Sequence, residues 1–421
     1  MIIILFLILL ILFYKMFEVS NSELPIFHLF FIQYFINYIL VPIIYYRNVD
    51  FQEASYMQMG ATEGQYLLFL VPMFLCFFLG LRATRFKFIF PSQLKLEKIK
   101  SRNYDLIFLM IGLVFKFIPL PDITALKFVY FLLVNFINVG FVISLMSPSR
   151  RTIYIGIVTL FILIQETLQT AMFGELMSWI LFFMLFYHLR NKPSMRLKGL
   201  QFSFLFFIVI SVQLIKGQYR KSVWIDGENS SISLVSNTIE GELNNRNGDQ
   251  SSTFLLRFNQ GFFFSRVIEH VPKIVEFQNG SHIINIFKAV ILPRFILPDK
   301  LTSGNSVITS KFTGKEIAKG TSMSIGVFGD CYIDFGFGIG LLLSFLVGLF
   351  LSLLFKSLVR ASEKNVIFYA FIPMAVYYTI RPDNDTHTAI AFLLKSLLLI
   401  YCMNWFFSEK TKNSIISHHL K

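Results

Sequence analysis

Gly320-Thr-Ser-Met-Ser-Ile-Gly-Val-Phe-Gly-Asp-Cys-Tyr-Ile-Asp-Phe-Gly-Phe-Gly-Ile-Gly340 decides the fold, because it closes a polar interval and then passes directly into an apolar helix. The interval extends over about residues 216–333 and separates two blocks of long apolar runs. Residues before about 215 and after about 334 have the composition of helices that cross a membrane. We therefore expect any chemistry of this chain to take place where the interval meets the membrane.

The composition indicates a helical membrane protein that crosses the bilayer many times. Of the 421 residues, 55% are hydrophobic and only 15% are charged, which is more apolar surface than a soluble domain needs. The net charge of +13 does not predict a nucleic-acid partner, because the cations gather in short loops between the apolar runs. The three scattered cysteines, Cys76, Cys331 and Cys402, fit neither a metal site nor a disulfide framework.

The apolar runs predict an all-α polytopic fold with about eleven transmembrane helices, each near the roughly 20 residues that a bilayer requires. The first run, Ile2–Tyr14, is expected to remain as a helix, because Lys15 follows it in place of a cleavage site. The runs lie near residues 2–14, 26–46, 65–81, 105–118, 126–146, 152–170, 176–189, 199–215, 334–355, 366–380 and 388–407. The expected parts are about eight transmembrane helices in 1–215, one large extracytoplasmic loop with amphipathic helices in 216–333, about three transmembrane helices in 334–407 and a cytoplasmic tail in 408–421.

Basic residues in the short loops set the expected orientation. If the helices alternate in direction, four loops with several Lys or Arg residues fall on one side of the membrane, whereas the opposing short loops contain only Arg47 and Arg381. Since cytoplasmic loops are enriched in Lys and Arg, the interval 216–333 and the loop 381–387 are expected to face outward. The basic loops are 82–104, 147–151, 190–198 and 356–364.

Two stretches of the interval have the pattern of amphipathic helices. Phe254–Val271 combines a stripe of phenylalanines with arginines, which predicts a helix that lies at the bilayer surface. Ile283–Ile291 is the second amphipathic stretch. Pro293 and Pro298 then interrupt regular structure on both sides of Arg294.

The outward-facing arginines predict an anion-binding site. Four of them lie in the interval near apolar or aromatic residues, and a fifth, Arg381, comes from a separate loop. A guanidinium group binds phosphate oxygens in a bidentate way and stays charged, which suits a lipid-linked diphosphate. The alternative for each arginine is that it only reaches toward lipid headgroups. The four interval arginines are Arg220, Arg257, Arg266 and Arg294.

The loop Arg381-Pro-Asp-Asn-Asp-Thr-His387 concentrates acid–base groups between two helices. His387 suits the role of a general base toward a sugar hydroxyl, because the unperturbed pKa of histidine is about 6.5. Asp383 and Asp385 are alternatives for the same role. An ordinary polar turn explains the loop equally well.

Two further charged residues are candidates. Lys395 lies about 10 Å inside the last predicted helix, where a cation needs a partner; either Glu166 pairs with it, or Lys395 adds positive potential to the site. Asp330 is an acid–base candidate in the glycine-rich run, whereas Asp334 is expected to cap the helix that begins near it. The sequence contains no Walker loop and no His-Glu-x-x-His motif, so neither a metal nor a cofactor is expected.

Two motifs resemble those of a known family, the O-antigen and capsule repeat-unit polymerases of the Wzy type. They are Leu292-Pro-Arg-Phe-Ile-Leu-Pro-Asp-Lys300 and Gly326-Val-Phe-Gly-Asp-Cys-Tyr-Ile-Asp-Phe-Gly-Phe-Gly-Ile339. The large outward loop with several arginines is similar as well. The resemblance in topology covers nearly the whole chain, and that in motifs about residues 290–340. It implies a GT-C-like helical fold in the bacterial inner (cytoplasmic) membrane, a periplasmic large loop and catalysis without a metal ion.

The resemblance implies a glycosyltransferase that polymerises lipid-linked repeat units of O-antigen, capsule or exopolysaccharide. The growing glycan would pass from undecaprenyl diphosphate to a new lipid-linked repeat unit. The implied partners are the undecaprenyl-diphosphate-linked oligosaccharide and membrane lipid, with a chain-length regulator and a flippase as further candidates. The alternatives are a flippase or transporter of lipid-linked oligosaccharides and an O-antigen ligase-like transferase. The expected catalytic residues are Arg257, Arg266, Arg294, Arg381, His387 and Asp330. The expected substrate-binding residues are Arg220, Lys300, Lys395 and Tyr332.

Overall fold

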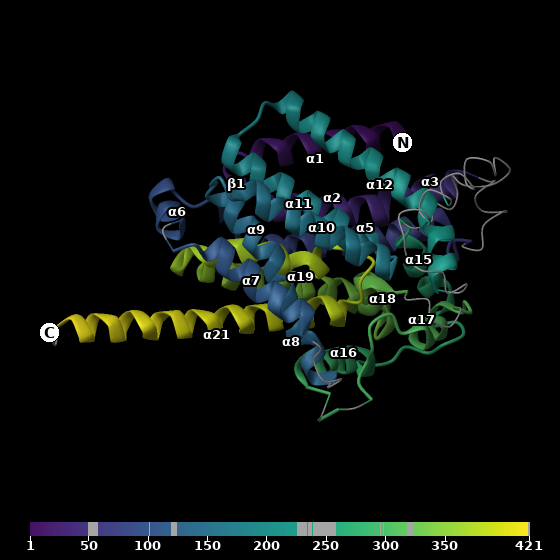
Figure 1. The fold of residues 1–421 in the computed structure, drawn as a ribbon. Coiled ribbons are helices and arrows are strands. Elements are labelled where there is room, and N and C mark those ends of the chain that lie inside the picture. The colour runs from purple at the N-terminus through teal and green to yellow at the C-terminus, as the bar shows by residue number, and fades with distance from the viewer. Residues whose placement is uncertain are drawn as a thin grey trace.

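The fold is mostly helical, with 77% of the residues in helices (Figure 1). The computed structural model describes residues 1–48, 58–100, 102–118, 124–224, 234, 238, 258–294, 296, 297, 299–317 and 323–419. Within these residues, eight helices are long and apolar enough to cross a membrane. The chain therefore has the character of a polytopic helical membrane protein. Its described part adds one small antiparallel sheet, made of β1 (Glu23–Leu24) and β2 (Phe88–Ile89).

The elements before the interval form most of the bundle. In chain order they are α1 (Ile2–Val19), α2 (Ile26–Phe35), the π-helix η1 (Ile36–Leu40), α3 (Val41–Arg47), α5 (Glu63–Arg82), α6 (Gln93–Lys100), α7 (Tyr104–Phe117), α8 (Thr124–Val134), α9 (Phe136–Met146), α10 (Thr152–Thr170), α11 (Phe173–Asn191) and α12 (Met195–Trp224). The last of these extends beyond the predicted end at 215, so Arg220 lies on a helix and not in a loop.

Within the described residues of the interval, four short helices precede the C-terminal helices. The interval contains α15 (Gly261–His270), α16 (Ser281–Ile291), α17 (Ser306–Thr313) and α18 (Gly326–Ile333). The elements after it are α19 (Gly336–Lys364), the 3₁₀ helix η2 (Val366–Phe371), α20 (Ile372–Ile380) and α21 (Thr386–His419). In Figure 1 the helices α15, α17 and α18 lie at one end of the bundle, and the basic helix α6 lies at the opposite end.

All eleven predicted runs coincide with helical segments, but only eight of these segments qualify as candidate membrane spans. The run 105–118 became α7, which has 14 residues. The run 366–380 is divided between η2 and α20 and is also short. The run 176–189 lies within α11, whose 19 residues include Glu175 and Arg190 near the two ends.

The crossing of α5 and α19 depends on two glycines. A Cβ atom on Gly80 would lie 2.2 Å from the carbonyl oxygen of Phe345, and one on Gly348 would lie 2.1 Å from that of Phe77. Both distances are far below van der Waals contact, so glycine at these positions lets the two backbones touch. This close contact anchors the interval, because α19 continues directly from it.

The prediction that Phe254–Val271 lies at the bilayer surface is wrong for its described part. Helix α15 buries Phe262, Phe264 and Val267, whose side chains are at most 2% exposed. It packs against α18 and α17 and leaves no apolar stripe for lipid. The phenylalanine stripe therefore serves the protein core.

Candidate functional site

Asp330 connects three helices that are far apart in the sequence. It lies on α18, where only 8% of the residue is exposed. One carboxylate oxygen lies 2.8 Å from Nε2 of His282 on α16, and the other accepts a hydrogen bond of 2.6 Å from the hydroxyl of Thr386, the first residue of α21. Asp330 therefore ties the interval to the start of the last helix, α21.

The negative charge of Asp330 affects the pKa of His282. Burial disfavours the imidazolium form of His282, but the hydrogen bond and the negative charge of Asp330 outweigh it, so the pKa of His282 is raised above its usual value. His282 is thus held as a hydrogen-bond donor beside a carboxylate. This buried contact fixes the relative position of α16 and α18.

Asp334 caps a helix, as expected, but the helix is α16 and not α19. Its carboxylate accepts hydrogen bonds from the backbone N–H groups of Gly280, His282 and Ile283, at 2.9, 3.1 and 2.8 Å. These N–H groups belong to the start of α16, whose orphan donors it satisfies. The predicted cap of α19 is wrong, because Phe335 occupies the N-cap position of α19 and no side-chain hydrogen bond caps that helix.

Arg381 is already neutralised by its own loop. Its guanidinium group donates to both carboxylate oxygens of Asp383, at 2.6 and 3.2 Å, and to the hydroxyl of Tyr377 at 3.0 Å. Burial would raise the pKa of Asp383, but the charge of Arg381 outweighs it and the pKa is lowered. Arg381 therefore acts in this structure as an organiser of the loop and not as a free anion ligand.

Asp385 and His387 supply the acid–base groups of the same loop. Asp385 accepts hydrogen bonds from the backbone N–H of Gly304 at 2.7 Å and from the hydroxyl of Ser303 at 3.4 Å. Burial raises the pKa of Asp385 despite these bonds. Nε2 of His387 is buried and has no hydrogen-bond partner among the described residues. The charges of Asp385 and Asp330 both act on His387, so the structure brings these predicted candidates together.

Three cations form the second half of the site, and we call Arg294, Lys300 and Lys395 the cationic cluster. The charges of Arg294 and Lys300 both act on Lys395, and that of Lys300 also acts on His387. Lys300 donates to the carbonyl oxygens of Ala289 and Leu292, at 3.0 and 2.8 Å, at the end of α16. Within the described part of the chain, no ion pair joins the cluster to a carboxylate. The cluster is therefore a positive region whose cations form no ion pair among the described residues.

Lys395 does not pair with Glu166, so that alternative of the sequence analysis is wrong. Glu166 on α10 forms its ion pair with Lys116 on α7. The ammonium group of Lys395 lies 4.3 Å from the ring centroid of Phe128, a cation–π contact. What remains is the other alternative, in which Lys395 adds positive potential to the site.

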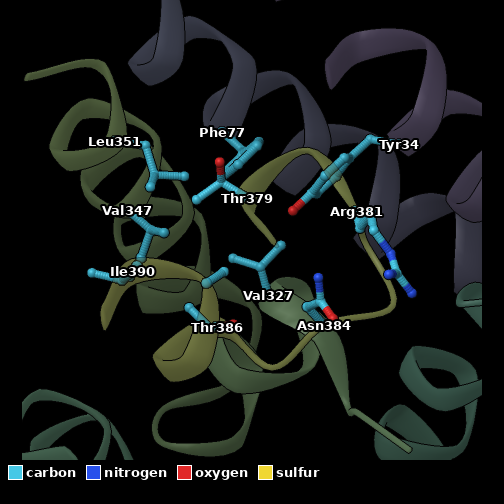
Figure 2. A pocket seen from close by; sticks show the side chains of 11 residues that line it. Tyr34, Phe77, Val327, Val347, Leu351, Thr379, Arg381, Asn384, Thr386 and Ile390 are labelled. Atoms are coloured by element: carbon cyan, nitrogen blue, oxygen red, sulfur yellow. The ribbon is translucent and has the colours of Figure 1, made fainter. Parts of the chain in front are cut away.

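A small cavity lies beside the loop 381–387 (Figure 2). Its volume is about 20 Å³, which is room for about one water molecule. Figure 2 shows the guanidinium group of Arg381 pointing away from the apolar side chains of Val347 and Leu351. A sugar ring is much larger than this cavity, so a sugar could enter it only if the residues that line it moved.

The remaining predicted residues lie elsewhere. Arg266 on α15 pairs with Glu269 at 2.7 Å, and Arg220 donates to the carbonyl of Ala171 at 3.0 Å. The side chain of Tyr332 is buried in the core, where its ring stacks on that of Phe69. Arg257 lies outside the described residues.

Sequence reasoning missed His282 and Thr386, the two partners of Asp330. A signal for His282 existed, because the Asn279-Gly280 dipeptide just before it is typical of a turn, and both residues have positive φ in the structure. Nothing in the sequence indicated that this start faces Asp330. Thr386 stood in the loop that the sequence analysis selected, but it is not an acid or a base.

A family model matches residues 82–364, about two thirds of the chain. The chain belongs to the family of the domain of unknown function DUF8712. Neither a curated protein nor a solved structure matches it. The DUF8712 match includes Arg294, Lys300 and Asp330 and ends with α19. Arg381, His387 and Lys395 follow it, so the candidate site combines DUF8712 residues with the C-terminal helices.

Proposed function

We propose that this DUF8712 protein is a membrane glycosyltransferase that polymerises lipid-linked oligosaccharide repeat units on the outer face of the bacterial inner membrane. The observation that carries the proposal is the cationic cluster beside Asp385 and His387. An unpaired positive region suits a diphosphate leaving group, and adjacent acid–base groups suit deprotonation of a sugar hydroxyl. The Wzy-type resemblance of residues 290–340 points to the same reaction.

The cationic cluster binds the diphosphate of the donor in this mechanism. When the bond between the anomeric carbon and the diphosphate oxygen breaks, negative charge grows on the leaving group. Arg294, Lys300 and Lys395 stabilise this charge, and Lys300 and Lys395 do so more strongly than they would in water, because their side chains are partly buried. Binding of the diphosphate also reduces the repulsion between the cations. In the free protein, burial and the charge of Arg294 lower the pKa of Lys300.

His387 takes the proton of the acceptor hydroxyl. Its buried Nε2 atom has no hydrogen-bond partner among the described residues, and it becomes available to substrate when the residues around it move. The carboxylate of Asp385 stabilises the imidazolium that forms. Oxygen of the acceptor then attacks the anomeric carbon, and the growing glycan moves onto the new repeat unit. Asp330, through His282 and Thr386, holds the two halves of the site together.

A flippase for the same lipid-linked sugars is the second candidate. It is favoured by charges among the apolar helices, namely Lys395 on α21 and the ion pair between Lys116 and Glu166. Ionisable residues at such positions often mark a transport path. The two functions differ in what they need, because polymerisation proceeds in detergent, whereas flipping requires a closed bilayer.

The test uses the purified full-length protein and undecaprenyl-diphosphate-linked repeat units in detergent. We expect a ladder of longer glycans on a gel, and we expect Arg294→Ala and Lys395→Ala to reduce it to single repeats. Lys273→Ala is the matched control, because Lys273 is an exposed cation of the same interval, and it should keep the ladder. Wild-type protein that makes no ladder but moves the lipid across vesicles would replace the polymerase with the flippase.

A further inference from the structure

The exposed surface of α16 is divided into an apolar half and a polar half. Ile284, Phe287 and Ile291 are 51%, 52% and 69% exposed. At about 100° per residue, they lie within about 60° of one another around the helix. The exposed polar residues Ser281, Asn285 and Lys288 occupy a neighbouring arc of about 60°. Large apolar side chains rarely form such a stripe in contact with water.

The third side of α16 faces the protein. His282, Ile286, Ala289 and Val290 are buried, and the helix packs against α21 and α18. Since α21 is a candidate membrane span that begins at Thr386, this packing holds α16 beside the end of a membrane-spanning helix. A helix in that place meets protein on one side, lipid on the second and water on the third.

We propose that α16 lies in the headgroup region of the bilayer, with Ile284, Phe287 and Ile291 inserted toward the acyl chains of phospholipids. The stripe has the form of an interfacial amphipathic helix. Charge fits the same partner, because Lys288 on the polar side and Arg294 just beyond the helix are exposed cations that suit anionic phosphates. Ile296, which is 58% exposed, continues the apolar surface after Arg294.

The insertion sets the depth of two cations of the cluster, Arg294 and Lys300. Arg294 follows α16 directly, and Lys300 is hydrogen-bonded to its end, at Ala289 and Leu292, so both move with the helix. A helix embedded among headgroups places these cations at the level of lipid phosphates. This inference concerns where α16 lies and holds for any reaction at the site.

Single labelled cysteines in the full-length protein test the proposal. Ile284→Cys, Phe287→Cys and Ile291→Cys, each in a background without the three native cysteines, are labelled with a nitroxide and reconstituted in phosphatidylcholine–phosphatidylglycerol vesicles. We expect the labels to be relaxed by oxygen, which concentrates in lipid, and to be protected from a water-soluble nickel complex. Asn285→Cys and Lys288→Cys are the matched controls on the polar arc and should show the opposite.

Two results would overturn the proposal. Stripe labels that are as open to nickel as the controls would place α16 in water. Stripe labels shielded from both reagents would show that protein, for example a second copy of this chain, covers the stripe. If the background without cysteines does not fold, Phe287→Trp and Lys288→Trp in the otherwise unchanged chain serve instead. Brominated phospholipids should then quench the added tryptophan at 287 several-fold more strongly than that at 288, and equal quenching would also overturn the proposal.

Discussion

The ring of His282 lies 2.8 Å from the carboxylate of Asp330, which joins the start of α16 to the middle of α18. The second oxygen of the same carboxylate holds Thr386 at the start of α21. These three helices carry the residues on both sides of the candidate site. Asp330 is therefore best described as a positioning residue, since it acts through groups that it orients.

His282→Ala should destabilise the protein by about 1–3 kcal/mol, because it leaves a buried carboxylate oxygen without its donor. Thermal unfolding of the purified protein in detergent measures the effect. Ser281→Ala is the matched control, since Ser281 is the exposed neighbour on the same turn. An unchanged melting temperature for His282→Ala would show that the contact does not hold α16 in place.

The same pair should make stability depend on pH. The folded protein raises the pKa of His282, so folding favours the protonated ring. The stabilisation is then complete below the unfolded value of about 6.5 and is lost as the pH rises through the raised folded value. Between about pH 6 and about pH 9, we expect the melting temperature of wild type to fall more than that of His282→Gln, which keeps a donor but does not titrate there. Parallel curves would argue against a charged His282.

His387→Gln should lower activity by about 10²–10⁴-fold, the range that general base catalysis contributes. Stability should change little, because Nε2 of His387 has no hydrogen-bond partner within the described residues. The ladder assay and a melting curve of the same preparation separate the two effects. Thr388→Ala, at the next residue, is the control. A fully active His387→Gln would transfer the role of base to Asp385.

The sequence was sufficient to locate the apolar helices but not to show which helices pack against one another. All eleven apolar runs coincide with helical segments, because burial in lipid demands length and hydrophobicity that single runs display. The polar helix α6 was not predicted. The apolar runs did not predict which charged side chains pair between helices. Lys395 and Glu166 both lie in apolar helices, and composition alone suggested that they meet, yet Lys116 on α7 takes Glu166. Which helices pack together depends on side-chain shape along whole faces, and a single run does not display that.

The sequence selected several residues of the candidate site but did not show which residues contact one another. Loop 381–387, Arg294, Lys300 and Lys395 were separate candidates in the sequence, and in the structure their charges act on one another. The contact between His282 and Asp330 was missed, because it depends on how α16 folds back after the turn at Gly280. The apolar stripes show the same limit. Both α15 and α16 are amphipathic in sequence, but tertiary packing buries the stripe of α15 and exposes that of α16.

Gly348→Leu should be among the most damaging single changes in the bundle. A side chain at this position meets the backbone of α5, since even a Cβ atom would lie 2.1 Å from the carbonyl oxygen of Phe77. Backbone does not move aside as a flexible side chain does, so we expect a loss of about 3 kcal/mol or more, at the upper end of overpacking effects. Gly338→Leu is the matched control on the same helix, because nothing lies within 4 Å of a Cβ atom there and leucine favours the helix over glycine. The yield of folded protein by size-exclusion chromatography and the melting temperature in detergent compare the two. Equal behaviour of both variants would mean that α5 and α19 do not cross at these glycines.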